Sequence, residues 1–141
     1  MDYKFKLKKE KVEDGWSFRP KIKISLINKD KIKNLIAVID TGSDLNYIPT
    51  ELAEYFDLQL SSKEFTAQGA EQEFSYKTSK IVVKIDHPHK FYRKLVEVMV
   101  PTKNTMHKDV ILGTEFLKDF ILTIDYHKAI LKLRENKATK G

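Results

Sequence analysis

The stretch LIAVIDTGSDLNYIPTEL, residues 35–52, places an acid at the end of an apolar run. Residues 35–39 are continuously apolar rather than alternating, which predicts a β-strand covered on both faces. Asp40 ends this run, and the sequence continues Thr-Gly-Ser. An ionised carboxylate in an apolar setting is costly unless neighbouring groups compensate it. The sequence therefore predicts a partly desolvated carboxyl group that its own loop holds in place.

The three residues after Asp40 can supply that compensation. Gly42 lets the backbone turn tightly and exposes amide N–H groups to the carboxylate. The hydroxyls of Thr41 and Ser43 can hold either the loop or the carboxyl group itself. Such surroundings tune a carboxyl pKa for proton transfer. An Asp-x-Gly sequence also commonly forms a turn in which the aspartate caps its own loop, so the motif alone leaves both interpretations open.

Alternating apolar and polar residues predict β-strands over much of the chain. The period of two runs through residues 3–8 and 16–26, with a turn at Asp14-Gly15 between them. Further strands are predicted, in chain order, at residues 71–77, 81–85, 94–100 and 110–112, and two more within residues 121–133 around a turn near His127. The pattern is typical of a mainly β domain.

Three segments depart from the strand pattern. Residues 50–56 and 114–120 gather apolar side chains on one helical face, which predicts two short helices, the first with Thr50 as its N-cap. Around Gln68-Gly69 the sequence predicts a hairpin whose tip uses the backbone freedom of glycine. These elements place Asp40 in an order of strands, helices and hairpin that can be compared with known protein families.

In that context the motif resembles the active-site loop of the retropepsin-like aspartic proteases, most of all those of gypsy-type LTR retrotransposons and plant pararetroviruses. DTGSDLNYIPTELAEYFDLQL, residues 40–60, resembles the family's loop followed by a short helix. TAQG, residues 66–69, resembles the tip of its flap hairpin. VILGTEFLKDFILTIDYHKAILKL, residues 110–133, resembles its I-L-G-x-x-F/W-L segment and the following acid-aromatic turn.

The resemblance implies a mainly β fold, a retropepsin-like acid-protease β-barrel with two short helices and one half-site per chain. It covers roughly residues 20–133, which are expected to form the protease domain. Residues 1–19 are expected to be an N-terminal extension that forms a β-hairpin arm, and residues 134–141 a basic, disordered tail.

The resemblance also implies a role for each residue of the candidate site. Asp40 is the expected catalytic residue. The active-site loop is expected at Thr41, Gly42 and Ser43, substrate binding at Asp44, Ala67, Gln68, Gly69 and Ala70, and structural support of the loop at Ile111, Leu112 and Gly113. Plainer alternatives stay open: a solvated turn residue for Asp44, an ordinary hairpin for the flap and a helix-start glycine for Gly113.

One copy of the motif cannot complete an aspartic protease site. Peptide hydrolysis by this route uses two carboxyl groups, one ionised to take a proton from water and one protonated to donate to the developing oxyanion. The chain contains only one Asp-Thr/Ser-Gly sequence. The expected solution is a homodimer in which each chain gives its Asp40 at a twofold axis, with Thr41 reaching across to the partner's loop.

The sequence departs from the retroviral pattern at three points. Retroviral enzymes usually carry an arginine after the second glycine, paired with an acid near the catalytic one, whereas this chain has Thr114 and Glu115 there. The flap has a single glycine, Gly69, which bears on its mobility. Retroviral dimers also interleave short terminal strands, and the extra N-terminal residues leave open whether this chain does the same.

Composition bears on cofactors and other function classes. The chain has no cysteine and no His-Glu-x-x-His sequence, and a proline separates His87 from His89, so neither a metal nor another cofactor is expected. The net charge is +6, but the basic residues alternate with apolar ones, so nucleic acid is not the expected partner. No apolar run approaches the roughly 20 residues that span a bilayer, so no membrane partner is expected.

The expected partners are a second copy of the chain and a polypeptide substrate, its own viral or retroelement polyprotein. The expected location is accordingly the host cytoplasm or a virus-like particle. Three alternatives remain: a cellular retropepsin-like domain, a catalytically inactive retropepsin-like module that dimerises or binds, and a basic nucleic-acid-binding β domain. The last has charge but lacks a clear aromatic platform on which bases could stack.

Overall fold

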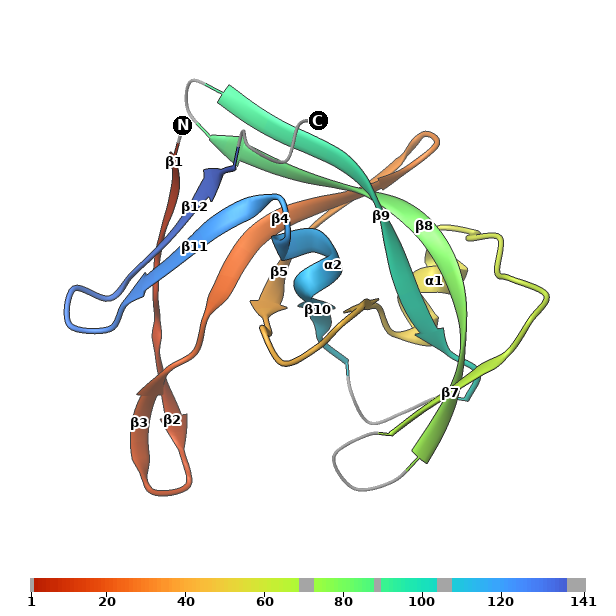
Figure 1. Ribbon diagram of the computed structural model, residues 1–141, viewed down its shortest axis with the longest axis horizontal. Coiled ribbons are helices and arrows are strands. Elements are labelled where there is room, and N and C mark those ends of the chain that lie inside the picture. The colour runs from red at the N-terminus through yellow and green to blue at the C-terminus, as the bar shows by residue number, and fades with distance from the viewer. Residues whose placement is uncertain (1, 69–72, 88–89, 104–107, 137–141) are drawn as a thin grey trace.

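The computed structural model describes residues 2–68, 73–87, 90–103 and 108–136. In this part of the chain, strands dominate and the two helices are short (Figure 1). The elements are β1 (Asp2–Lys6), β2 (Lys9–Val12), β3 (Gly15–Phe18), β4 (Lys21–Asn28), β5 (Lys31–Ile39), β6 (Asn46–Tyr47), α1 (Thr50–Tyr55), β7 (Phe65–Gln68), β8 (Glu73–His87), β9 (Lys90–Pro101), β10 (Val110–Leu112), α2 (Thr114–Leu117), β11 (Phe120–Asp125) and β12 (Ile130–Glu135). The prediction of a mainly β domain with two short helices is confirmed.

A closed sheet forms the body of the molecule. Its strands follow the order β4-β5-β10-β6-β9-β8, and β8 pairs again with β4 to complete a barrel. Alternate residues of β4, β8 and β9 point into one hydrophobic cluster, as period-two strands require. These are Ile22, Ile24, Leu26, Ile81, Val83, Ile85, Val96, Val98 and Val100.

The longest strand corrects one prediction from the sequence. The strands expected at residues 71–77 and 81–85 are parts of a single strand, β8, which runs without interruption from Glu73 to His87. Its length lets it pair with β7 near one end, with β4 near the other and with β9 from Tyr76 to His87. No glycine or proline lies within β8, so the polar residues that suggested a break remain in the strand.

The strand before Asp40 corrects a second prediction. Ala37 and Ile39 are buried, but Ile36 is 48% exposed, so β5 is not covered on both faces. Both edges of β5 are paired, with β4 and with β10. Only one face of such a strand can line the barrel. The sequence did not indicate this because residues on the outer face, such as Ile36, are also apolar.

The helices are close to their predicted places, with two corrections. Pro49 occupies the N-cap position of α1, and the Thr50 hydroxyl instead donates to the Pro101 carbonyl oxygen at 3.1 Å. α2 ends at Leu117, because Phe120 already begins β11. The predicted second helix, residues 114–120, therefore wrongly included the turn at residues 118–119 and the first residue of β11, Phe120.

The two ends of the chain meet in a second sheet of order β1-β12-β11. Tyr3 pairs with Leu133, and both side chains are fully buried in the core. At the rim, Arg134 Nε donates to Asp2 Oδ1 at 2.8 Å, and this hydrogen bond holds the pKa of Asp2 below its usual value. The first strand of the stretch expected to be an extension thus forms part of the core, and β12 continues two residues past 133.

Between β1 and β4 the chain forms a two-stranded hairpin that stands away from the body (Figure 1). It consists of β2 and β3, joined at the turn predicted for Asp14-Gly15. Gly15 has φ +133°, a conformation that side chains rarely adopt. We call residues 9–18 the hairpin arm.

Candidate active site

The loop that carries Asp40 begins where β5 leaves the barrel. The Asp40 N–H donates to the Leu112 carbonyl oxygen at 3.0 Å, which extends the pairing of β5 with β10 by one residue. The Gly42 N–H donates to Asp40 Oδ1 at 2.9 Å. One carboxylate oxygen is therefore held by the turn that follows it, and the carboxyl group has a defined direction.

The surroundings of Asp40 differ from those predicted in one respect. Asp40, Thr41 and Gly42 are all exposed in the single chain. The prediction of a partly desolvated carboxyl group is thus wrong for the isolated chain. The reason is topological: the loop lies beyond the end of the barrel, so the barrel walls do not enclose it.

Ser43 supports the loop rather than the carboxyl group. Its hydroxyl donates to the Leu45 carbonyl oxygen at 2.7 Å, and its N–H donates to the Asp40 carbonyl oxygen at 3.2 Å. Of the two roles that the sequence left open for the Ser43 hydroxyl, the structure selects the first. The loop closes on itself through two separate hydrogen bonds.

Gly113 lies directly beneath this loop. A Cβ atom there would come within 2.4 Å of the Ser43 carbonyl oxygen and 2.6 Å of the Leu45 carbonyl oxygen. Both are backbone atoms, so neither can rotate away. Ile111 and Leu112 precede it in β10, where they pair with residues 38 and 39 of β5. The segment 111–113 is therefore in contact with the Asp40 loop, and Gly113 permits that close approach.

Asp44 connects the loop to the start of α2. Its carbonyl oxygen accepts hydrogen bonds from the Thr114 hydroxyl and the Glu115 N–H, both at 3.1 Å. The Thr114 N–H also donates to the Ser43 carbonyl oxygen at 2.8 Å. Asp44 itself is exposed, so its carboxyl group is available at the loop surface.

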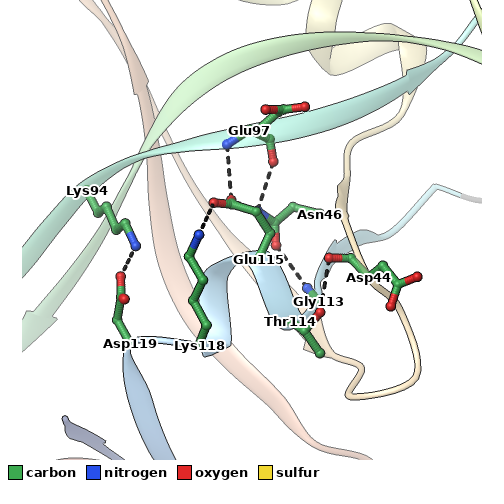
Figure 2. A network of polar contacts seen from close by, with 9 residues as sticks. All are labelled: Asp44, Asn46, Lys94, Glu97, Gly113, Thr114, Glu115, Lys118 and Asp119. Carbon is green, nitrogen blue, oxygen red and sulfur yellow. Dashed lines mark hydrogen bonds and ion pairs between the residues drawn. The ribbon is translucent and has the colours of Figure 1, made fainter. Parts of the chain in front are cut away.

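Sequence reasoning missed the residue at the centre of this arrangement, Asn46 (Figure 2). Asn46 is fully buried. Its Nδ2 donates to the Glu97 carbonyl oxygen at 2.9 Å and to Glu115 Oε1 at 2.8 Å, while its Oδ1 accepts from the Gly113 N–H at 2.9 Å. Asn46 thus joins β6, β9 and the start of α2 directly behind the loop. The available signal was an amide among the apolar residues 45–48, since a buried amide needs partners.

Glu115 completes the same network from α2. Its Oε1 also accepts the Glu97 N–H at 3.1 Å, and its Oε2 lies 3.6 Å from Lys118 Nζ. Nearby, Lys94 pairs with Asp119 (Figure 2), and burial lowers the pKa of Lys94. The segment after Gly113 lacks the arginine that retroviral enzymes usually carry there. In this chain the Glu115 carboxylate stabilises the segment, because it accepts hydrogen bonds from the Asn46 amide and the Glu97 N–H.

The network predicts a large effect for Asn46→Asp. An aspartate cannot donate to the Glu97 carbonyl oxygen, and its charge would face the Glu115 carboxylate. We expect a loss of about 3 kcal/mol in the free energy of unfolding at neutral pH, measured by urea denaturation. The loss should shrink as the pH falls, because protonation of either acid restores a donor.

Asn34→Asp is the matched control for this change. Asn34 Oδ1 accepts a hydrogen bond from the Ser25 hydroxyl at 2.6 Å, and an aspartate oxygen can accept the same bond. We expect a change of roughly 0.5 kcal/mol or less there. Equal denaturation midpoints for the two variants would contradict the role given to Asn46.

The flap residues lie on a separate hairpin. Ala67 pairs with Phe74 and Gln68 with Glu73, across strands β7 and β8. Gly69 and Ala70, which were expected at its tip, lie outside the described residues. The structure therefore brings residues 40–46 together with residues 111–115, and places Ala67 and Gln68 on another part of the sheet.

Other candidate chemistry receives no support from the described residues. No group of three or more histidine, aspartate or glutamate side chains among them is arranged to hold a metal ion. Of the histidine pair considered for a metal, His89 lies outside the described residues. In that same part of the chain, no helix has the length and apolar character that crossing a membrane requires.

Comparisons with known proteins agree with this architecture. No protein-family model matches the sequence, and no curated protein matches it either. A solved structure of a retropepsin-like aspartic protease from Rickettsia conorii matches with a TM-score of 0.58 and 18% identity, over 94% of this chain and 91% of that one. The chain has the retropepsin-like fold. The fold class predicted from the sequence is thereby confirmed.

A second solved structure with this fold is similar to a lesser degree. It is the EIAV protease in complex with the inhibitor HBY-793, with a TM-score of 0.47 and 14% identity, over 72% of this chain and 86% of that one. Within the retropepsin-like fold of this chain, the Asp-Thr-Gly loop lies at the end of β5.

Proposed function

We propose that this chain is an aspartic endopeptidase that works as a homodimer. The observation that carries the proposal is the placement of Asp40 in the retropepsin-like fold. Its carboxyl group is exposed at the end of the barrel and oriented by the Gly42 N–H at 2.9 Å. An exposed, oriented carboxyl group on a rigid strand end suits a site that a second chain completes.

The chemistry follows from two Asp40 carboxyl groups that share one proton. Two negative charges that close cannot both persist, so the pair titrates as a unit. The ionised carboxylate takes a proton from water as the water oxygen attacks the scissile carbonyl carbon. The protonated partner donates to the carbonyl oxygen as negative charge develops there. As the tetrahedral intermediate breaks down, the carboxyl group that took the proton from water gives it to the leaving nitrogen, the other carboxylate takes back a proton from a hydroxyl of the intermediate, and the C–N bond breaks to give an amine and a carboxylic acid.

The other residues have supporting roles in the proposal. Ser43 and Gly113 hold the loop, Thr41 contacts the partner's loop, and Asp44 binds the substrate backbone. The hairpin with Ala67, Gln68, Gly69 and Ala70 closes over the substrate and excludes bulk water. The hydrogen bonds of Asp44 and Ser43 to the start of α2 support the first of these assignments.

We further propose that the substrate is the polyprotein of a virus or retroelement. We take a plant pararetrovirus as the first candidate source and a gypsy-type retrotransposon as the second; residues 40–60 and 110–133 resemble the enzymes of both. The location that follows is the host cytoplasm or a virus-like particle. Cleavage of the encoded polyprotein at defined junctions by the purified chain would support this assignment, and cleavage of unrelated proteins alone would contradict it.

A dilution series tests the dimeric mechanism. Well below the dissociation constant, the dimer concentration follows the square of the total chain concentration, so a tenfold dilution should lower the peptidase activity per unit volume about 100-fold and the activity per chain about tenfold. Sedimentation velocity at the same concentrations measures the mass. Activity that stays proportional to concentration while the protein sediments as a monomer would exclude the proposed mechanism. A dimer without any cleavage would favour the inactive binding module.

A further inference from the structure

The hairpin arm is the part of the described chain with the least support from the rest of it. Its strands pair only with each other, with Lys11 opposite Trp16 and Lys9 opposite Phe18. Figure 1 shows it projecting from the lower left of the body. A lone two-stranded hairpin is marginally stable in water. Packing against another surface would therefore stabilise the arm.

One face of the arm carries an exposed tryptophan, Trp16. Trp16 is the only tryptophan of the chain and is 61% exposed. It shares a face with Phe18, which is partly buried against the core at the base of the arm, and with Lys9, whose Nζ lies 5.9 Å from the indole ring. This face therefore carries two aromatic rings, Phe18 against the core and Trp16 further out and exposed, with Lys9 and Lys11 opposite them on the neighbouring strand. Tryptophan is also the residue type most often found at energetic centres of interfaces.

The base of the arm lies next to the candidate catalytic residue. The Ile39 N–H donates to the Pro20 carbonyl oxygen at 2.7 Å, and Lys21 pairs with Val38. Ion pairs from Glu10 to Lys21 at 2.8 Å and to Arg19 at 3.6 Å tie the first strand of the arm to this base. The arm thus joins the body through Arg19 and Pro20, and Pro20 is hydrogen-bonded to Ile39, the residue before Asp40.

This position determines what the arm can meet. In the proposed dimer the two Asp40 carboxyl groups lie at roughly hydrogen-bonding distance across the axis, so the base of each arm lies beside the axis as well. A strand rises about 3.3 Å per residue, which gives an arm of this length a reach of roughly 15 Å. An arm that starts beside the axis and extends that far is long enough to reach the second chain.

We propose that the hairpin arm is a dimerisation element whose Trp16 face packs on the second copy of this chain. The proposal rests on the proposed homodimer and adds to it a surface outside the active-site loop. Twofold symmetry makes the contact occur twice, so each chain both gives an arm and receives one.

The sole tryptophan makes a direct measurement possible. The probe is the full-length Asp40→Asn chain, which cannot degrade itself and carries no charge repulsion at the axis. Its tryptophan emission and acrylamide quenching are followed over a concentration series, with sedimentation velocity on the same samples. We expect the emission to shift to shorter wavelength and the quenching to fall together with dimer formation.

The other outcomes of this experiment would overturn the role of the arm, the proposed function, or both. A dimer in which Trp16 stays exposed would overturn the role of the arm and leave the proposed function intact. Burial of Trp16 in the monomer, or only after a peptide inhibitor is added, would also overturn it, because the arm would then pack on its own body or on substrate. No dimer at any concentration would overturn both proposals.

Trp16→Ala in the active chain provides the second test. We expect it to raise the dimer dissociation constant about 30-fold without changing turnover per dimer at saturating protein concentration. Phe91→Ala is the matched control, since Phe91 is 63% exposed on β9, away from the arm. Equal dissociation constants for the two variants would contradict the proposal.

Discussion

Replacing Asp40 with asparagine is expected to lower peptidase activity by about 10⁴-fold, because the pair loses both its general base and its general acid. Asparagine can still accept the Gly42 N–H that now binds Asp40 Oδ1, so the loop should keep its shape. The measurement is cleavage of a fluorogenic peptide library or of the encoded polyprotein. A pepstatin-like inhibitor should abolish the activity of the parent chain.

Mixing the two chains sharpens this test. If each dimer needs two Asp40 residues, an excess of Asp40→Asn chain should draw the parent chain into inactive mixed dimers. Activity should then fall as the variant is added at constant parent concentration. A variant that retains full activity would show that the catalytic group lies elsewhere, and a mixture whose activity does not change would show that catalysis does not need two Asp40 residues.

Replacing Gly113 with alanine should strongly destabilise the fold. The new Cβ atom would lie 2.4 Å from the Ser43 carbonyl oxygen and 2.6 Å from the Leu45 carbonyl oxygen, and the Gly113 N–H is held by Asn46. The loop and α2 must therefore separate. We expect a loss of about 3 kcal/mol in the free energy of unfolding, measured by urea denaturation, together with loss of activity.

Gly42→Ala is the informative comparison. A Cβ atom at Gly42 would lie 3.2 Å from Asp40 Oδ1, a side-chain atom at an exposed site. The carboxyl group can turn away from it, so we expect a loss of roughly 1 kcal/mol or less in stability but a clear loss of activity. If Gly113→Ala were no more destabilising than Gly42→Ala, the close packing assigned to Gly113 would be wrong.

Several elements could be predicted from the sequence because their causes are local. The alternation in β4 and β9, the turn at Asp14-Gly15 and the strand end before Asp40 all depend on neighbouring residues. The Asp-Thr-Gly loop and the segment 110–113 were recognised for the same reason. Their contact with each other was expected only through the resemblance to known proteases.

The errors occurred where distant residues decide the outcome. Ile36 is apolar but exposed, because the closure of the barrel selects one face of β5. β8 continues through polar residues because β9 pairs with it from Tyr76 to His87. The exposure of Asp40 depends on the loop lying beyond the barrel end, which no local pattern reports.

The sequence by itself determined the strand-rich class and the single Asp-Thr-Gly loop, since spacing and residue count contain that information, and the proposal of a second chain rests on that single copy together with the resemblance to known proteases. Only the tertiary structure decided how the loop is supported. Asn46 meets Glu115 across 69 positions of the chain, and Asp2 meets Arg134 across 132. Such pairs form because chain closure brings them together, and nothing in the residues beside them specifies the partner.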